Sequence, residues 1–168
     1  MPSINAKEIE AILRSLSDSI TIFEGFLRSI PPDKLDERRG ETFWSIHEHA
    51  DHLAGVQPML LERMRRILSE DMPEFIPFIP EQDEVVEEAT LHTVREIIEQ
   101  FKAMREKQLD LLKNVGPEDW EKMAFHPEYD QYGLLILARH VFMHDHWHLY
   151  RMEELWLTKD EYLTRLEG

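Results

Sequence analysis

The sequence of 168 residues contains no cysteine. Disulfide bonds, thiolate metal ligands and a cysteine nucleophile are therefore excluded, so any metal or catalytic site must use histidine, aspartate or glutamate. Basic residues are also scarce, because 19 Lys and Arg stand against 34 Asp and Glu, for a formal net charge of −15. This deficit argues against nucleic acid or an anionic membrane surface as a partner, since both attract a basic protein face.

Long apolar runs are missing as well. The longest is Leu-Leu-Ile-Leu-Ala at residues 134–138, far short of the roughly 20 residues that span a bilayer. The first residues do not combine a basic segment with an apolar stretch, so no signal peptide is predicted and we expect a cytoplasmic protein. The length suits one domain, which we take to cover residues 1–168.

Apolar residues recur at helical spacing in four stretches, and these stretches carry helix start and stop signals. Three starts have a polar residue followed three positions later by glutamate, which is the capping-box pattern. The first stretch ends at the consecutive prolines Pro31 and Pro32, and the third ends at Gly116 followed by Pro117. The predicted helices begin near Asn5, Ser45, Thr93 and Gly133.

Two features set the arrangement of these helices. Pro58 lies within the second helix and predicts a kink at residues 54–58. Residues 70–90 contain three prolines and an acidic run, and this segment is too long for a tight hairpin, so it predicts a crossover that lets helices two and three run parallel. Thr158 is positioned to cap a short C-terminal helix. The fold class is therefore an all-α four-helix bundle.

Four of the nine histidines fall within residues 139–152. His144 and His148 are four residues apart on the core stripe of the last helix, the spacing at which one helix offers two imidazoles to one metal ion. A third ligand must come from another helix. His52 is the best candidate, although spacing alone does not separate it from His49, because both border the core stripe of the second helix.

Three imidazoles leave a coordination position open, which is typical of a catalytic metal site rather than a structural one. A bound ion would then lower the pKa of water or of a thiol, or polarise a carbonyl. The competing interpretation is a structural bundle whose buried histidines are satisfied by hydrogen bonds. His47 and His146 are expected on the outer faces, and the nearby carboxylates Glu48, Asp51 and Asp145 are expected mostly in solvent.

Three motifs carry a family resemblance. They are W-S-I-H-E-H-A-D-H-L at residues 44–53, H-P-E-Y-D-Q-Y-G at residues 126–133 and H-D-H-W-H-L at residues 144–149. Their order and spacing resemble the DinB/YfiT-like superfamily of metal-binding four-helix proteins, whose patterns are W-S-x-x-E-x-x-x-H-L, H-P-x-y-G and H-D-x-x-H. The resemblance covers most of the chain from residue 44 onward.

The resemblance implies an up-down-down-up bundle, often a homodimer, with a divalent zinc or nickel ion held by three histidines. At the matching positions these are His52, His144 and His148, which favours His52 over His49. Relatives include thiol-dependent S-transferases and isomerases and metal-dependent hydrolases. We therefore expect an enzyme that activates water or a low-mass thiol against a small electrophilic substrate, with no catalytic residue predicted beyond the ligands. The alternative is a non-catalytic, metal-binding stress-response bundle.

Overall fold

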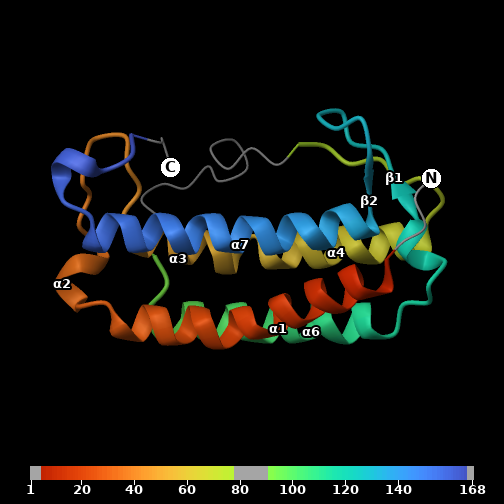
Figure 1. Cartoon of the computed structure of the whole chain (residues 1–168), viewed down its shortest axis with the longest axis horizontal. Coiled ribbons are helices and arrows are strands. Elements are labelled where there is room, and N and C mark those ends of the chain that lie inside the picture. Colours follow the sequence, from red (N-terminus) through yellow and green to blue (C-terminus); the bar gives the residue numbers. More distant parts are fainter. Residues whose placement is uncertain (1–4, 78–90, 166–168) are drawn as a thin grey trace.

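The computed structural model describes residues 5–77 and 91–165. Four long helical segments lie side by side along the molecule (Figure 1), and a four-residue helix, α2, follows the first of them. The helices are α1 (Ala6–Ser29), α2 (Pro32–Leu35), α3 (Ile46–Gly55), α4 (Gln57–Ser69), α6 (Val94–Lys113) and α7 (Leu134–Leu157). No helix in these described ranges is long and apolar enough to cross a membrane.

The helices have the predicted up-down-down-up order. In Figure 1, α3 and α4 run in the same direction as α6, and α1 and α7 run in the opposite direction. Helix α1 packs against α6 and α7, and α3 with α4 packs against the same two helices, which closes the bundle. The predicted crossover joins α4 to α6, and its central residues 78–90 lie outside the described part of the chain.

Two of the three predicted capping boxes are confirmed. The side chains of Ser45 and Thr93 each accept a hydrogen bond from a backbone N–H three residues on, and the glutamate at that position binds back to the cap. The box at Asn5 is wrong. Its side chain accepts from the Lys7 N–H at 3.0 Å, while the carboxylate of Glu8 pairs with Arg139 of α7 at 3.1 Å. A tertiary ion pair has replaced the local contact.

The predicted kink in the second helix is an interruption at the single residue Val56. Helix α3 ends at Gly55 and α4 begins at Gln57, so Pro58 lies in the first turn of a new helix, where its missing N–H removes no hydrogen bond. The break divides the second bundle segment into a half that carries His52 and a half that carries Arg63.

The connection from α6 to α7 contains a 3₁₀ turn and two short strands that the sequence did not predict. These are the 3₁₀ turn η1 (Asp119–Glu121) and the antiparallel strands β1 (Met123–Ala124) and β2 (Tyr132–Gly133). A Cβ atom at Gly133 would lie 2.5 Å from the backbone oxygen of Lys122, so only glycine fits this close approach. The short C-terminal helix is a three-residue 3₁₀ turn, η2 (Asp160–Tyr162). The predicted cap at Thr158 is wrong, because Lys159 precedes the turn and Thr158 ends α7.

The bundle core is made of two apolar clusters with a polar layer between them. One cluster includes Leu16 and Met64, and the other includes Phe23 and Phe101. The polar layer lies between them and takes buried side chains from all four bundle segments: Ser19 of α1, Gln57 of α4, Arg105 and Gln108 of α6, and Asp145 of α7.

Arg105 is the centre of this layer. Its guanidinium donates to the carboxylate of Asp145 and to the hydroxyl of Ser19, both at 2.7 Å, and to the side-chain oxygens of Gln57 at 3.1 Å and Gln108 at 2.9 Å. The side chains of Arg105 and Asp145 are 0% and 1% exposed. A charge removed from water so completely is tolerated only when it is paired and hydrogen-bonded, so the layer constrains how the helices face one another.

Replacing Asp145 with alanine should lower the free energy of unfolding of the metal-free protein by about 3–5 kcal/mol, because it leaves Arg105 buried without its counter-charge. Urea unfolding measures the change. The matched control is Glu99→Ala, which removes the exposed partner of Arg95 on α6 and should cost less than about 1 kcal/mol. Equal effects from the two substitutions would contradict a central role for the buried pair.

Candidate metal centre and adjoining cavity

The structure brings together the three histidines that the sequence analysis selected. His52 comes from the last turn of α3, and His144 and His148 come from successive turns of α7. The Nε2 atom of His144 lies 3.3 Å from Nε2 of His52 and 3.2 Å from Nε2 of His148. One ring nitrogen from each residue lies within 4.8 Å of the others.

These separations suit a single metal ion. Imidazole nitrogens bound at about 2.0–2.1 Å around a tetrahedral ion lie about 3.3 Å apart. The two nitrogen separations involving His144 are close to that value. A set of three imidazoles is characteristic of sites for zinc, nickel, copper or iron. The chemistry and the spacing of the donor atoms therefore both fit a divalent ion.

Burial keeps these imidazoles neutral, which is the form that binds a metal. It lowers the pKa of His52 to about 4, with a smaller contribution from nearby His144. The pKa of His148 is also lowered, first by burial and then by the neighbouring histidines. Burial likewise lowers the pKa of His144, and the charge of Asp145 opposes this shift.

His49 lies behind His148 rather than among the three converging nitrogens. The side chain is fully buried, and its Nδ1 lies 2.8 Å from Nδ1 of His148. If His148 offers its Nε2 lone pair to an ion, its Nδ1 must carry the proton and donate to Nδ1 of His49. With an ion on Nε2, this contact would hold His148 in that tautomer. The sequence analysis treated His49 only as a rival third ligand, and helical spacing carried no signal for this pairing.

Two tryptophans lie against the histidines. The Trp44 ring centroid is 5.2 Å from the rings of both His49 and His52, and the Trp147 centroid is 4.7 Å from that of His148. Trp44 precedes the Ser45 cap and packs on the fourth helical residue, as in a hydrophobic staple. The capping box and this staple together set the start of α3, and through it the position of His52.

The expectations for the remaining histidines were only partly right. His146 is exposed, as predicted. His47 is not a free surface residue, because its two ring nitrogens each lie 2.7 Å from an acceptor, one on Asp36 and the other the backbone oxygen of His92. This pairing across connecting segments depends on tertiary structure, which helical spacing does not reveal.

The nearby carboxylates also have partners elsewhere. Asp145 was expected in solvent, and that expectation is wrong because Arg105 draws it into the core. Asp51 binds His92, and Glu48 completes the Ser45 capping box and pairs with Arg38. These hydrogen bonds tie the carboxylates to groups other than His52, His144 and His148.

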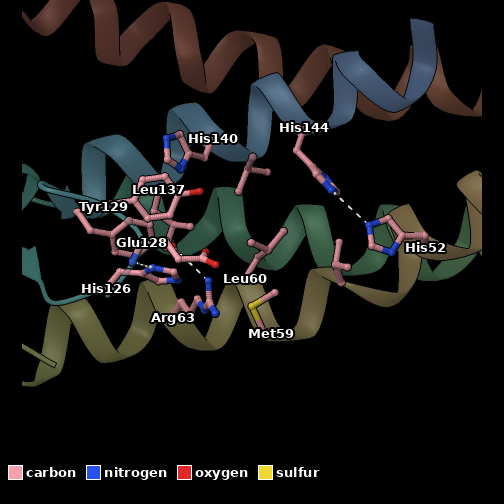
Figure 2. A pocket seen from close by; sticks show the side chains of 13 residues that line it. His52, Met59, Leu60, Arg63, His126, Glu128, Tyr129, Leu137, His140 and His144 are labelled. Carbon is pink, nitrogen blue, oxygen red and sulfur yellow. Dashed lines mark hydrogen bonds between the residues drawn. The ribbon is translucent and has the colours of Figure 1, made fainter. Parts of the chain in front are cut away.

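A cavity of about 200 Å³ adjoins the histidine cluster. His52 and His144 lie at one end, Met59 and Leu60 line its middle, and a polar group occupies the other end (Figure 2). That polar end is formed by Arg63, His126, Glu128, Tyr129 and His140. Tyr132, whose hydroxyl lies 3.4 Å from the Arg63 guanidinium, also belongs to it. The volume is below the roughly 300–1,000 Å³ of a typical drug-sized pocket, so the cavity suits a small ligand.

The polar end of the cavity was not predicted from the sequence. The Arg63 guanidinium donates to the Tyr132 hydroxyl at 3.4 Å, and the His126 and His140 rings lie 4.9 and 5.2 Å from that of Tyr129. Burial lowers the pKa of both His126 and His140. The sequence signal for this end was the motif at residues 126–133, of which His126, Glu128, Tyr129 and Tyr132 line the cavity.

The fold and the site define a class, a helix bundle in which the second and fourth segments bring three histidines to the end of a cavity. The chain belongs to the DinB superfamily, whose family model matches residues 15–158. No curated protein matches it significantly.

Among solved structures, the fold is similar to that of YfiT from Bacillus subtilis, with a TM-score of 0.80 and 16% sequence identity. The similarity covers 92% of this chain and 89% of that one. YfiT is described as a probable metal-dependent hydrolase with an unusual four-helix bundle topology. At this level of identity the likeness establishes the fold.

In the metal-free protein, the His52 imidazole should remain neutral until the pH approaches about 4. The unfolded chain takes up a proton at its usual value of 6.5, so between pH 6.5 and 4 the unfolded state binds more protons and the free energy of unfolding falls as the pH falls. NMR titration of the imidazole resonances measures the first effect. Urea unfolding measures the second, which should be smaller in His52→Leu. A His52 midpoint near 6.5 in the folded protein would contradict the effect of burial.

Proposed function

We propose that His52, His144 and His148 bind one divalent metal ion, zinc or nickel, and that the protein is a metal-dependent enzyme acting on a small electrophilic substrate. The observation that carries this proposal is the convergence of three Nε2 atoms next to a cavity. A sealed metal site would favour a non-catalytic bundle, whereas His52 and His144 line space that a ligand can enter.

Three histidine ligands leave a coordination position open for a ligand from the cavity. When bound, a divalent ion would lower the pKa of a water or thiol so that a nucleophile is present at neutral pH. The chain's own residues hold the site ready for this. With an ion on Nε2 of His148, His49 would accept the hydrogen bond from Nδ1 of that ring, and Met59 and Leu60 give the cavity an apolar wall.

A thiol is the nucleophile we favour over water. The chain has no cysteine, so a thiol must enter as a cosubstrate. Three neutral imidazoles leave the positive charge of the ion uncompensated, which favours a bound thiolate near neutral pH. The reaction proposed is therefore thiol S-transfer, with hydrolysis as the second candidate because YfiT, of similar fold, is described as a probable metal-dependent hydrolase. A homodimer and a cytoplasmic location stay predictions.

Purified without a histidine tag, the native protein should bind about one divalent ion per chain, measured by elemental analysis after equilibration with zinc or nickel. His52→Ala, His144→Ala and His148→Ala should each abolish tight binding, because two imidazoles remain. The matched control is His146→Ala, which removes an exposed histidine from the same helix as two of the ligands. His47→Ala should also retain the metal.

A further variant distinguishes the candidate metal ligands from His49, which contacts His148 but is not expected to bind the metal. His49→Leu should weaken metal affinity by about 10–100-fold without abolishing binding, because it removes the acceptor for His148 Nδ1. Full metal retention by His52→Ala would remove His52 from the ligand set and favour His49 or His140 instead. Absence of binding by the native protein with both metals would refute the site.

The choice between thiol transfer and hydrolysis can be measured on one electrophile. Metal-loaded protein should accelerate the reaction of 1-chloro-2,4-dinitrobenzene with 2-mercaptoethanol, which forms a thioether and releases chloride, more than it accelerates hydrolysis of the same compound. His148→Ala is the background. Acceleration of hydrolysis alone would exclude the transferase and retain the hydrolase. If neither rate exceeds that of His148→Ala across further thiols and electrophiles, the non-catalytic alternative is favoured.

A further inference from the structure

Arg63 is unusual among the arginines of this acidic protein. Within the described residues every arginine forms an ion pair with a carboxylate, except Arg63 and the near-terminal Arg165. With 34 acidic residues in the chain, partners are abundant, and the neighbouring Arg66 pairs with Glu70 at 2.8 Å. Arg63, which lines the cavity, therefore has no carboxylate at ion-pair distance among the described residues.

The guanidinium of Arg63 is nevertheless held in place. One terminal nitrogen donates to the backbone oxygen of Ile76 at 2.8 Å, and the other approaches the Tyr132 hydroxyl at 3.4 Å. Its central carbon lies 5.4 Å from the centroid of the Phe75 ring. A guanidinium has five N–H donors, so several remain free for a ligand. Its fork matches the two oxygens of a carboxylate.

The surroundings of Arg63 favour a singly charged anion. Glu128 lines the same end of the cavity (Figure 2), and its negative charge opposes a dianion such as a phosphate monoester. His126 and His140 add hydrogen-bonding atoms there, and burial keeps both rings neutral near pH 7. One guanidinium beside the Glu128 carboxylate and two neutral imidazoles therefore suits a monoanion with planar oxygens better than a dianion.

We propose that the polar end of the cavity binds a carboxylate through Arg63, so the natural ligand carries a reacting group and a carboxylate at opposite ends of an apolar segment. The reacting end lies toward His52 and His144, the apolar segment passes Met59 and Leu60, and the carboxylate reaches Arg63 (Figure 2). The reacting end rests on the proposed function, whereas the carboxylate subsite depends only on Arg63 and its neighbours.

The first test uses cobalt-loaded protein and two thiols that differ only at the far end, 6-mercaptohexanoate and 6-mercaptohexan-1-ol. Binding is followed by the thiolate-to-cobalt charge-transfer band, and shorter and longer homologues of both thiols allow for the span of the cavity. The carboxylate should bind about 10-fold or more tightly than the alcohol, because hydrogen bonds to a charged group are the stronger kind. A preference for 6-mercaptohexyl phosphate over the carboxylate would overturn the assignment to a monoanion.

The variants Arg63→Gln and Arg66→Gln provide a matched comparison. Both arginines lie on α4 and both approach the Phe75 ring, but Arg66 does not line this cavity. The preference for the carboxylate should disappear in Arg63→Gln and persist in Arg66→Gln. Arg63→Lys retains the positive charge but lacks the forked guanidinium, so its preference for the carboxylate over the alcohol should be intermediate. It replaces Arg63→Gln in the comparison if that variant folds poorly. Persistence of the preference in Arg63→Gln would overturn the inference.

A second measurement separates this inference from the proposed function. Hexanoate and hexan-1-ol are titrated into metal-free protein, and the Met59 methyl resonance, which reports on the cavity, is followed by NMR. Hexanoate should bind more tightly, and Arg63→Gln should remove the difference. If thiols give no charge-transfer band while hexanoate retains its preference, the thiol chemistry fails and the subsite stands. If native protein does not prefer hexanoate, the subsite is refuted whatever the thiols do.

Discussion

The buried ion pair between Arg105 and Asp145 is the constraint on which the rest of the structure depends. It lies at the middle of the bundle, at 2.7 Å, with both side chains almost completely removed from water. Ser19 and Gln57 accept further hydrogen bonds from Arg105, so every bundle segment contributes to one polar layer. The second carboxylate oxygen of Asp145, Oδ1, is buried and has no hydrogen-bond partner within the described residues. Apolar packing tolerates small rotations of a helix about its axis. A buried ion pair tolerates much less rotation, because the cost of removing its charges from water is offset only while the two side chains stay paired and hydrogen-bonded.

That layer has a direct consequence for the histidine cluster. Asp145 lies next to His144 in sequence and one turn before His148, so anchoring Asp145 fixes the rotation of α7 about its axis. The parallel course of α3–α4 and α6 leaves α3 beside α7, which allows His52 to approach His144. Three nitrogens then meet at separations suited to one ion, although the imidazoles come from helices that are far apart in sequence.

The cavity beside the three histidines adds space for a ligand next to the candidate metal site. The break at Val56 starts a new helix, and its residues line the cavity from Met59 to Arg63. Burial lowers the pKa of the histidines at both ends, so the cavity holds neutral imidazoles. It also holds the guanidinium of Arg63, which forms no ion pair with a described carboxylate. The two polar ends separated by an apolar wall define the type of molecule that the site can hold.

The sequence by itself determined the helices and much of the site. Local signals were sufficient for the capping boxes at Ser45 and Thr93, because these bonds join residues three apart. The spacing of His144 and His148 likewise fixes one helix face. Family motifs then selected His52, which spacing could not distinguish from His49.

Only the tertiary structure decided which partners those faces meet. It turned His49 toward His148, drew Asp145 to Arg105 and joined Glu8 to Arg139. It also placed Arg63 beside a cavity, with no ion pair to any carboxylate in the described part of the chain. Each of these outcomes depends on distances between helices that the periodicity of a single helix does not contain. Hydrogen bonds and charges act over a few ångströms across the bundle, so they are decided when the helices pack.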